Sequence, residues 1–152
     1  MGNVQLPYEY ENTVEDYERS ALEVISPIKP TPENIATGKV LYTNMCAICH
    51  GENGNGKGYI VTAGKYTAAP PSYFDPGYID MPDGKMFHSI TYGKNAMGSY
   101  AYALNKLERW QIISYINSLQ NEWLAENTEA AVEAVVTANA EEMNEGETTI
   151  TQ

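Results

Sequence analysis

The sequence predicts an all-α domain whose helices are joined by long loops. Two segments, one near 32–47 and one from Asn105 to about Gln120, carry apolar residues at spacings of three and four, the period of a helix with one buried face. The intervening residues 51–82 are rich in glycine, proline and tyrosine, a composition that disfavours regular structure. No internal repeat and no convincing strand pattern interrupts this arrangement. Loops of this length usually wrap a ligand or carry a function.

The charge is distributed unevenly along the 152 residues. The net charge of −11 divides into −4 over 1–32, +1 over 33–120 and −8 over 121–152. We therefore expect an extended N-terminal arm (1–32), a near-neutral central domain (33–120) and an acidic C-terminal tail (121–152). The basic surface of a nucleic-acid-binding protein is missing from this pattern. No apolar run approaches the ~20 residues that would span a bilayer.

The first elements expected are helical. A short helix over 14–24 would interrupt the arm. Thr31 has the side chain of a helix N-cap and Pro32 suits a first helical turn, so a helix is expected from about 32 to 47. Five residues would share one face of that helix: Ile35, Gly38, Leu41, Tyr42 and Met45.

Two more helices are expected after the long loop. One begins at Asp83-Gly84, carries Met86, Phe87, Ile90 and Tyr92, and stops at Gly93. Asn105, followed three residues later by Glu108, predicts a capping box that opens the last helix. That helix would end near Gln120, and its tail would be partly helical and frayed, with Trp123 and Leu124 as candidates to dock. Its buried face would consist of Leu107, Trp110, Ile113, Tyr115, Ile116 and Leu119.

The only two cysteines stand three positions apart in Cys46-Ala47-Ile48-Cys49-His50. A disulfide between them would close too small a loop to stabilise the fold, and a zinc site would need more ligands than the one other histidine, His88. A thioredoxin-like site would need a βαβ context. Cys-x-x-Cys-His is the attachment sequence of a c-type haem, whose iron takes the histidine as proximal ligand. We therefore expect one haem c, covalent through Cys46 and Cys49 and ligated by His50.

A longer segment carries a family resemblance. Gly38-Lys39-Val40-Leu41-Tyr42, followed by Cys-Ala-Ile-Cys-His-Gly-Glu-Asn-Gly-Asn-Gly-Lys-Gly, resembles the class I cytochrome c family, and the resemblance extends over about 33–120. It implies the class I cytochrome c fold, in which long loops wrap the haem and the first and last helices cross closely. At the crossing, Gly38 would let the backbones approach while Tyr42 and Tyr115 pack together.

The resemblance also implies a sixth iron ligand. The family places an axial Met in the loop before the last helix, where this chain has Met97 within residues 93–100, followed by Gly98 where the family usually has Pro. Met81, Met86 and His88 are the alternatives. Met86 fits a position in the hydrophobic core better than a ligand position. His88 as a ligand would give bis-histidine ligation and a lower reduction potential, and the other interpretation is an ordinary buried or surface histidine.

Two further residues are assigned by the resemblance. The segment Ala69-Pro70-Pro71-Ser72-Tyr73 resembles a family loop in which a proline carbonyl accepts a hydrogen bond from the proximal histidine, so Pro71, or Pro70, is the expected acceptor. Trp110 would lie beside the haem edge, near a propionate, and a plain core aromatic is the other interpretation.

These ligands predict a function. An iron held by His50 and Met97 is closed to substrates and suits single-electron transfer, so the chain is expected to be a carrier without catalytic residues of its own. The main alternative is a five-coordinate haem that binds gas or peroxide, with His88 as the distal group. Two further alternatives are a freely soluble cytochrome c and a haem domain that only anchors other subunits.

Three stretches indicate a particular group of cytochromes. The Pro-Pro-Ser-Tyr loop, the helix from Gly84 to Gly93 and the Met97 loop with Glu108-Arg109-Trp110 resemble the mono-haem cytochrome c subunit of bacterial alternative complex III. That resemblance implies electron transfer from a membrane quinol-oxidising complex towards a terminal oxidase or another cytochrome, on the periplasmic side of the inner membrane. The acidic flanks would either be solvated, as such segments usually are, or lie along partner subunits. The family's lipid anchor would lie outside this chain, which has no Cys before Cys46 and shows no secretory signal in its first residues.

Overall fold

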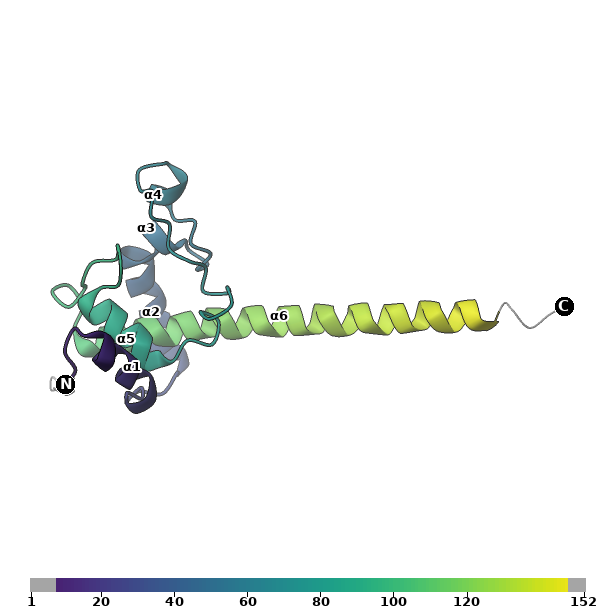
Figure 1. The fold of residues 1–152 in the computed structure, drawn as a ribbon, viewed down its shortest axis with the longest axis horizontal. Helices are drawn as coiled ribbons and strands as arrows, with labels where there is room; N and C mark the ends of the chain where they lie inside the picture. Colours follow the sequence, from purple (N-terminus) through teal and green to yellow (C-terminus); the bar gives the residue numbers. More distant parts are fainter. Residues whose placement is uncertain (1–7, 148–152) are drawn as a thin grey trace. The chain divides into compact units, whose positions relative to one another are not determined.

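A computed structural model describes residues 8–147 of the chain, with side chains as far as residue 128. The described residues form six helices (Figure 1), and the only strand-like pairing among them is an isolated bridge between Lys94 and Met97. The predicted all-α class is therefore confirmed. The chain divides into two compact units, Met1–Gln120 and Asn121–Gln152. The helices are α1 (Val14–Glu23), α2 (Pro32–Met45), α3 (Ala47–His50), α4 (Tyr59–Thr62), α5 (Asp83–Tyr92) and α6 (Lys106–Glu147).

The helix ends follow the local signals in the sequence. Thr31 caps α2, because its Oγ1 accepts a hydrogen bond from the Asn34 N–H at 3.3 Å. Asn105 and Glu108 form the predicted capping box, in which each side chain accepts from the other residue's backbone N–H at 3.0 and 2.7 Å. α5 stops at Gly93, whose φ of 87° is a conformation that side chains rarely adopt.

α2 and the start of α6 cross in close contact at Gly38. A Cβ at this position would stand 1.9 Å from the carbonyl oxygen of Gln111, so only glycine allows the backbones to approach this far. Beside it, the rings of Tyr42 and Tyr115 meet edge to face with centroids 5.2 Å apart. The crossing predicted at Gly38, Tyr42 and Tyr115 is thus confirmed.

The N-terminal segment is more structured than an extended arm. α1 forms close to the predicted bounds and packs along α5, and both helices belong to the first unit (Figure 1). The contact is tight, because a Cβ at Gly84 would lie 1.8 Å from the carbonyl oxygen of the fully buried Ser20. The described part of the arm therefore covers one face of the central domain.

The last helix differs from the prediction in two respects. It continues through Gln120 to Glu147, because residues 121–145 contain neither glycine nor proline and are rich in the strong helix formers alanine and glutamate. Leu107, expected on the buried face, is 44% exposed, whereas Ile112 is fully buried. The apolar period correctly predicts that one face of the helix is buried, but it does not show at which residue along that face burial begins.

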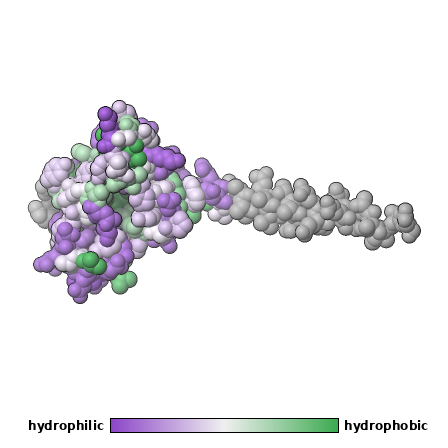
Figure 2. Space-filling view, turned by 45° about the horizontal axis from the view of Figure 1, so that its top comes forward, coloured by the Kyte–Doolittle hydropathy of each residue, from purple (hydrophilic) through white to green (hydrophobic). Residues whose placement is uncertain are grey.

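The face of the first unit drawn in Figure 2 is mostly polar. Hydrophilic residues predominate on this face, and its hydrophobic areas are small and separate (Figure 2). Among the residues that the structure describes, no helix is long and apolar enough to cross a membrane. The second unit contains the residues of α6 from Asn121 to Glu147, and two side chains in its first turns bond to the backbone, Asn127 to the Trp123 carbonyl and Thr128 to the Leu124 carbonyl.

Candidate haem-binding site

The two cysteines lie at the junction of α2 and α3. The Cys46 N–H still bonds to the Tyr42 carbonyl (2.8 Å), and the Cys46 carbonyl accepts from the N–H groups of Cys49 (3.1 Å) and His50 (2.9 Å). One helical turn therefore separates the two thiols and places His50 directly after them. Both are free cysteines, Cys46 buried and Cys49 half-buried. Burial raises the pKa of the Cys46 thiol to about 12, so it is protonated at neutral pH.

His50 is held as a neutral imidazole. Burial lowers its pKa to about 4, and neutral imidazole is the form that binds metals. Its Nδ1 is buried and makes no hydrogen bond. The phenol ring of Tyr73 stacks on the imidazole, with centroids 5.1 Å apart and planes at 16°. An immobilised neutral imidazole immediately after two free thiols is the donor set that a covalent haem requires, so these residues fit the cofactor.

The loop after His50 folds back over the cysteine motif. The Gly56 N–H bonds to the His50 carbonyl (2.8 Å) and the Gly58 N–H to the Cys49 carbonyl (3.0 Å). A Cβ at Gly56 would stand 2.3 Å from the Pro70 carbonyl oxygen, so the Pro70-Pro71 backbone lies directly against this loop. The structure shows no bond from His50 Nδ1 to either proline carbonyl. Pro71, or Pro70, as the acceptor for His50 therefore stays a prediction.

Met97 lies in a tight turn between α5 and α6. The backbone groups of Lys94 and Met97 bond to each other in both directions, at 2.9 and 3.0 Å. From the long loop, Tyr66 donates its hydroxyl hydrogen bond to the Ala96 carbonyl at 2.9 Å. The Met97 side chain is half-buried and packs against the core cluster that contains Cys46. The turn is thus held by its own backbone bonds and by Tyr66, and Met97 as an iron ligand stays a prediction.

The base of this turn is fixed to the ends of α5 and α6. Ser99 donates its hydroxyl to the Thr91 carbonyl (2.6 Å), and the buried Arg109 donates Nη1–H to the Thr91 hydroxyl (2.7 Å) and Nε–H to the Leu104 carbonyl (3.1 Å). Burial lowers the pKa of the Arg109 guanidinium. The guanidinium therefore links the end of α5 to Leu104, shortly before α6, a role that the sequence does not indicate.

The match to known proteins agrees with this geometry. Residues 33–116, more than half of the chain, match the family model described as cytochrome c oxidase, cbb3-type, subunit III. The chain belongs to this cytochrome c family. The fold is accordingly a class I cytochrome c fold, and the family implies covalent haem c, which the cysteine pair 46 and 49 fits.

This cytochrome is similar to chains in solved structures. One of them belongs to the reducing HAO-like protein complex Kustc0457/Kustc0458 of Kuenenia stuttgartiensis, with 27% identity and a TM-score of 0.53. The similarity covers 61% of the present chain but only 46% of the other, so this cytochrome corresponds to less than half of its neighbour's length. No curated protein matches the chain.

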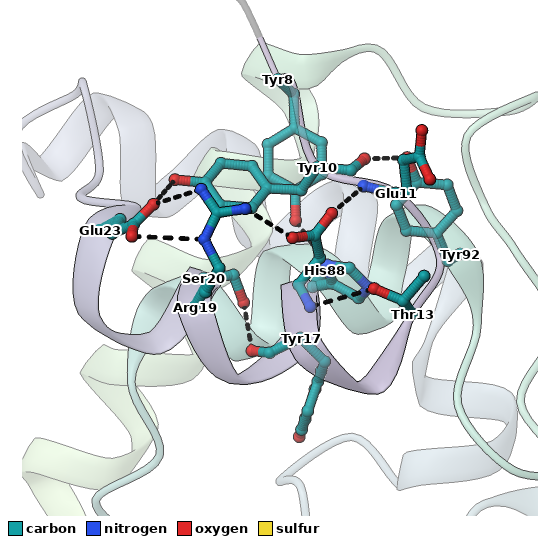
Figure 3. Close-up of polar contacts among 11 residues, drawn as sticks. Tyr8, Tyr10, Glu11, Thr13, Tyr17, Arg19, Ser20, Glu23, His88 and Tyr92 are labelled. Carbon is teal, nitrogen blue, oxygen red and sulfur yellow. Dashed lines mark hydrogen bonds and ion pairs between the residues drawn. The ribbon is translucent and has the colours of Figure 1, made fainter.

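Two of the alternative ligands, His88 and Met86, are buried among other side chains of the cytochrome. Figure 3 shows the His88 ring of α5 among side chains of the N-terminal segment. His88 is 2% exposed, its Nδ1 shares a hydrogen bond with the Tyr8 hydroxyl (2.8 Å), and its ring meets Tyr17 edge-on. Met86 is buried in the core, and Met81 packs against that core from the loop. These contacts agree with the structural interpretation of His88 and Met86.

Trp110 is a buried core aromatic in this structure. It stacks on Phe87 with ring centroids 4.4 Å apart and planes at 20°. It also lines a pocket with Tyr8 and Val24 of the N-terminal segment. Its assignment to the haem edge is not tested by these contacts and stays a prediction.

The residue that sequence reasoning missed is Tyr73. The prolines of this loop carry the family resemblance, but nothing in the loop's composition indicates that a tyrosine two residues after them stacks on His50. The surplus of tyrosines in 51–82 was the available signal, since such rings need a packing surface and a hydroxyl partner when they are buried. Among the described residues, no three His, Cys, Asp or Glu side chains gather as a metal site.

Proposed function

We propose that this cytochrome carries single electrons on one haem c whose iron is ligated by His50 and Met97. When bound, haem c supplies reversible one-electron chemistry between ferric and ferrous iron. The observation that carries the proposal is the pair of rigid supports, Tyr73 against His50 and the bonded turn that holds Met97. Rigid imidazole and thioether ligands leave no coordination position for a substrate and keep the site similar in both oxidation states.

The position of His88 favours this reading over a gas- or peroxide-binding haem. Such a site needs a polar group free to face the sixth position of the iron. His88, the candidate for that role, is buried between α5 and the N-terminal segment and is bonded to Tyr8. Recruiting it as a ligand would require α1 and its flanking residues to leave α5.

The ligand assignment is tested with a matched pair, Met97→Leu and Met86→Leu. We expect the ferric wild type to show the weak red absorption band of methionine-ligated haem and the reduced wild type to bind CO slowly. Met97→Leu should lose the band, bind CO rapidly and have a lower reduction potential, because the thioether stabilises ferrous iron. Met86→Leu should keep all three wild-type properties. Rapid CO binding by the wild type would support a five-coordinate haem instead.

We further propose that the chain works as the mono-haem subunit of a quinol-oxidising membrane assembly like alternative complex III, on the periplasmic side. The resemblance in the Pro-Pro-Ser-Tyr loop, α5 and the Met97 loop supports this, as does the similar solved structure, which is that of a protein complex. The acidic segments 1–32 and 121–152 offer charge for contact with partner subunits. Purification from native membranes tests the assignment: we expect the chain to co-migrate with membrane haem and iron–sulfur subunits. A chain that is monomeric and free of membranes would be a soluble cytochrome c.

A further inference from the structure

The contact between Tyr73 and His50 has a consequence for the redox chemistry. The two rings are nearly parallel, at 16°, and their centroids are 5.1 Å apart. Tyr73 is neither an attachment residue nor an axial ligand. We propose that Tyr73 is a positioning residue that fixes the plane of the His50 imidazole, keeps water from it, and thereby raises the reduction potential of the haem. The inference rests on the proposed function only in that His50 ligates the iron.

The backbone of Tyr73 is held on both sides. Its N–H bonds to the Gly54 carbonyl at 2.9 Å, and its carbonyl accepts from the Gln120 Nε2 at 3.0 Å. The same Gln120 amide, 5% exposed, also donates to the Tyr78 carbonyl at 2.8 Å. A Cβ at Gly54 would stand 2.5 Å from the Tyr73 ring, so glycine is needed for the ring to take this position. The loop is therefore fixed where it meets His50.

The Tyr73 ring is also packed against Tyr42. The two rings meet edge to face with centroids 6.3 Å apart, and the Tyr42 hydroxyl donates a hydrogen bond to the Gly51 carbonyl at 2.7 Å. Burial and the neighbouring Tyr42 raise the pKa of Tyr73 well above its usual value, so the phenol stays neutral. Gly51 directly follows His50, and Tyr42 lies one helical turn before Cys46. The network therefore joins the Tyr73 ring to the backbone on both sides of the cysteine motif.

These restraints act on the imidazole in two ways. A ring clamped by a parallel neighbour cannot turn freely about its bond to a metal, so its plane is set by Tyr73. The same ring covers His50 and lowers the local dielectric constant, which disfavours the more positively charged ferric state. Removing the ring would admit water, which can also accept a hydrogen bond from the imidazole and make it a stronger donor to ferric iron. Both effects lower the reduction potential.

The test compares Tyr73→Leu, Tyr73→Phe and the control Tyr102→Leu in the haem-loaded protein. Tyr102 is 87% exposed, so its loss should change nothing at the site. For Tyr73→Leu we expect about a tenfold shift of the ferric-to-ferrous equilibrium towards ferric, which is 59 mV for one electron. The EPR g values of the ferric protein, which report the imidazole plane, should also change. Tyr73→Phe should keep both properties close to those of the wild type, because it keeps the stacked ring.

The proposal is overturned if Tyr73→Leu matches Tyr102→Leu in potential and g values. It is equally overturned if Tyr73→Phe shifts as far as Tyr73→Leu, since the hydroxyl and not the stacked ring would then be responsible. Should Tyr73→Leu fail to take up haem, Tyr73→Met offers a longer, more flexible side chain that fills part of the space without a ring, and it carries the same expectation. Failure of the proposed function would look different, because the wild type itself would then lack a low-spin spectrum with histidine ligation.

Discussion

The crossing of α2 and α6 makes a quantitative prediction for Gly38→Ala. The added Cβ would lie 1.9 Å from the carbonyl oxygen of Gln111 and 2.5 Å from its carbon, and both are backbone atoms that cannot rotate away. Ordinary contact begins near 3.4 Å, so the helices would have to part by about 1.5 Å. Overpacking of this kind costs ~3 kcal/mol, against ~1 kcal/mol gained from the helix propensity of alanine. The net loss of about 2 kcal/mol corresponds to a Tm roughly 8 °C lower for a unit of this size.

The assay is thermal unfolding of the haem-loaded protein, followed by far-ultraviolet circular dichroism and by haem absorbance. Gly98→Ala is the matched control, because a Cβ there meets no atom within 4 Å and Gly98 does not have a positive φ. The control should leave Tm unchanged or raise it slightly through the entropy of the unfolded chain. A Gly38→Ala protein as stable as Gly98→Ala would refute the close crossing, since alanine is otherwise the better helix former.

Two further predictions concern the N-terminal segment and the tail. Burial lowers the pKa of His88, so the folded protein holds it neutral while the unfolded chain takes up a proton below about pH 6.5. The free energy of unfolding of the wild type should therefore fall as the pH drops from 6.5 towards 5. Urea titrations at these pH values should show a smaller fall for His88→Gln. Parallel losses in the two proteins would contradict this. A chain ending at Gln120 should keep the wild-type Tm and reduction potential, because the described contacts of the site lie within the first unit. If the shortened chain loses its haem absorbance at a temperature below the wild-type Tm, this prediction is wrong.

Local signals in the sequence predicted most helix ends. The caps at Thr31 and Asn105 and the stop at Gly93 each depend on a side chain or a glycine within four residues of the helix end. The predicted end of α6 near Gln120 is wrong, because the apolar period stops there and the helix continues to Glu147. Residues 121–145 need no buried face to be helical when glycine and proline are missing from them.

The attachment residues were predictable for a chemical reason. Two thiols and one imidazole at fixed spacing are required by the covalent haem, so Cys46, Cys49 and His50 stand out from the sequence alone. The supports of these residues were not predictable in this way. Tyr73 reaches His50, and Tyr66 reaches Ala96, from irregular loops whose path no periodicity describes. Such contacts depend on the loop conformation, which becomes known only with the fold.

The tyrosines explain how so irregular a domain can hold rigid ligands. Loop carbonyls lack the partners that a helix or sheet would give them, and each one left unpaired and buried would cost stability. In this chain, with 12 tyrosines, phenol hydroxyls serve as those partners: Tyr42 bonds to the Gly51 carbonyl, Tyr66 to that of Ala96, and Tyr92 to that of Tyr10. Each ring also supplies apolar area, so one residue both packs and bonds. Because these bonds fix the backbone beside His50 and beside Met97, the same residue type stiffens both sides of the proposed iron site.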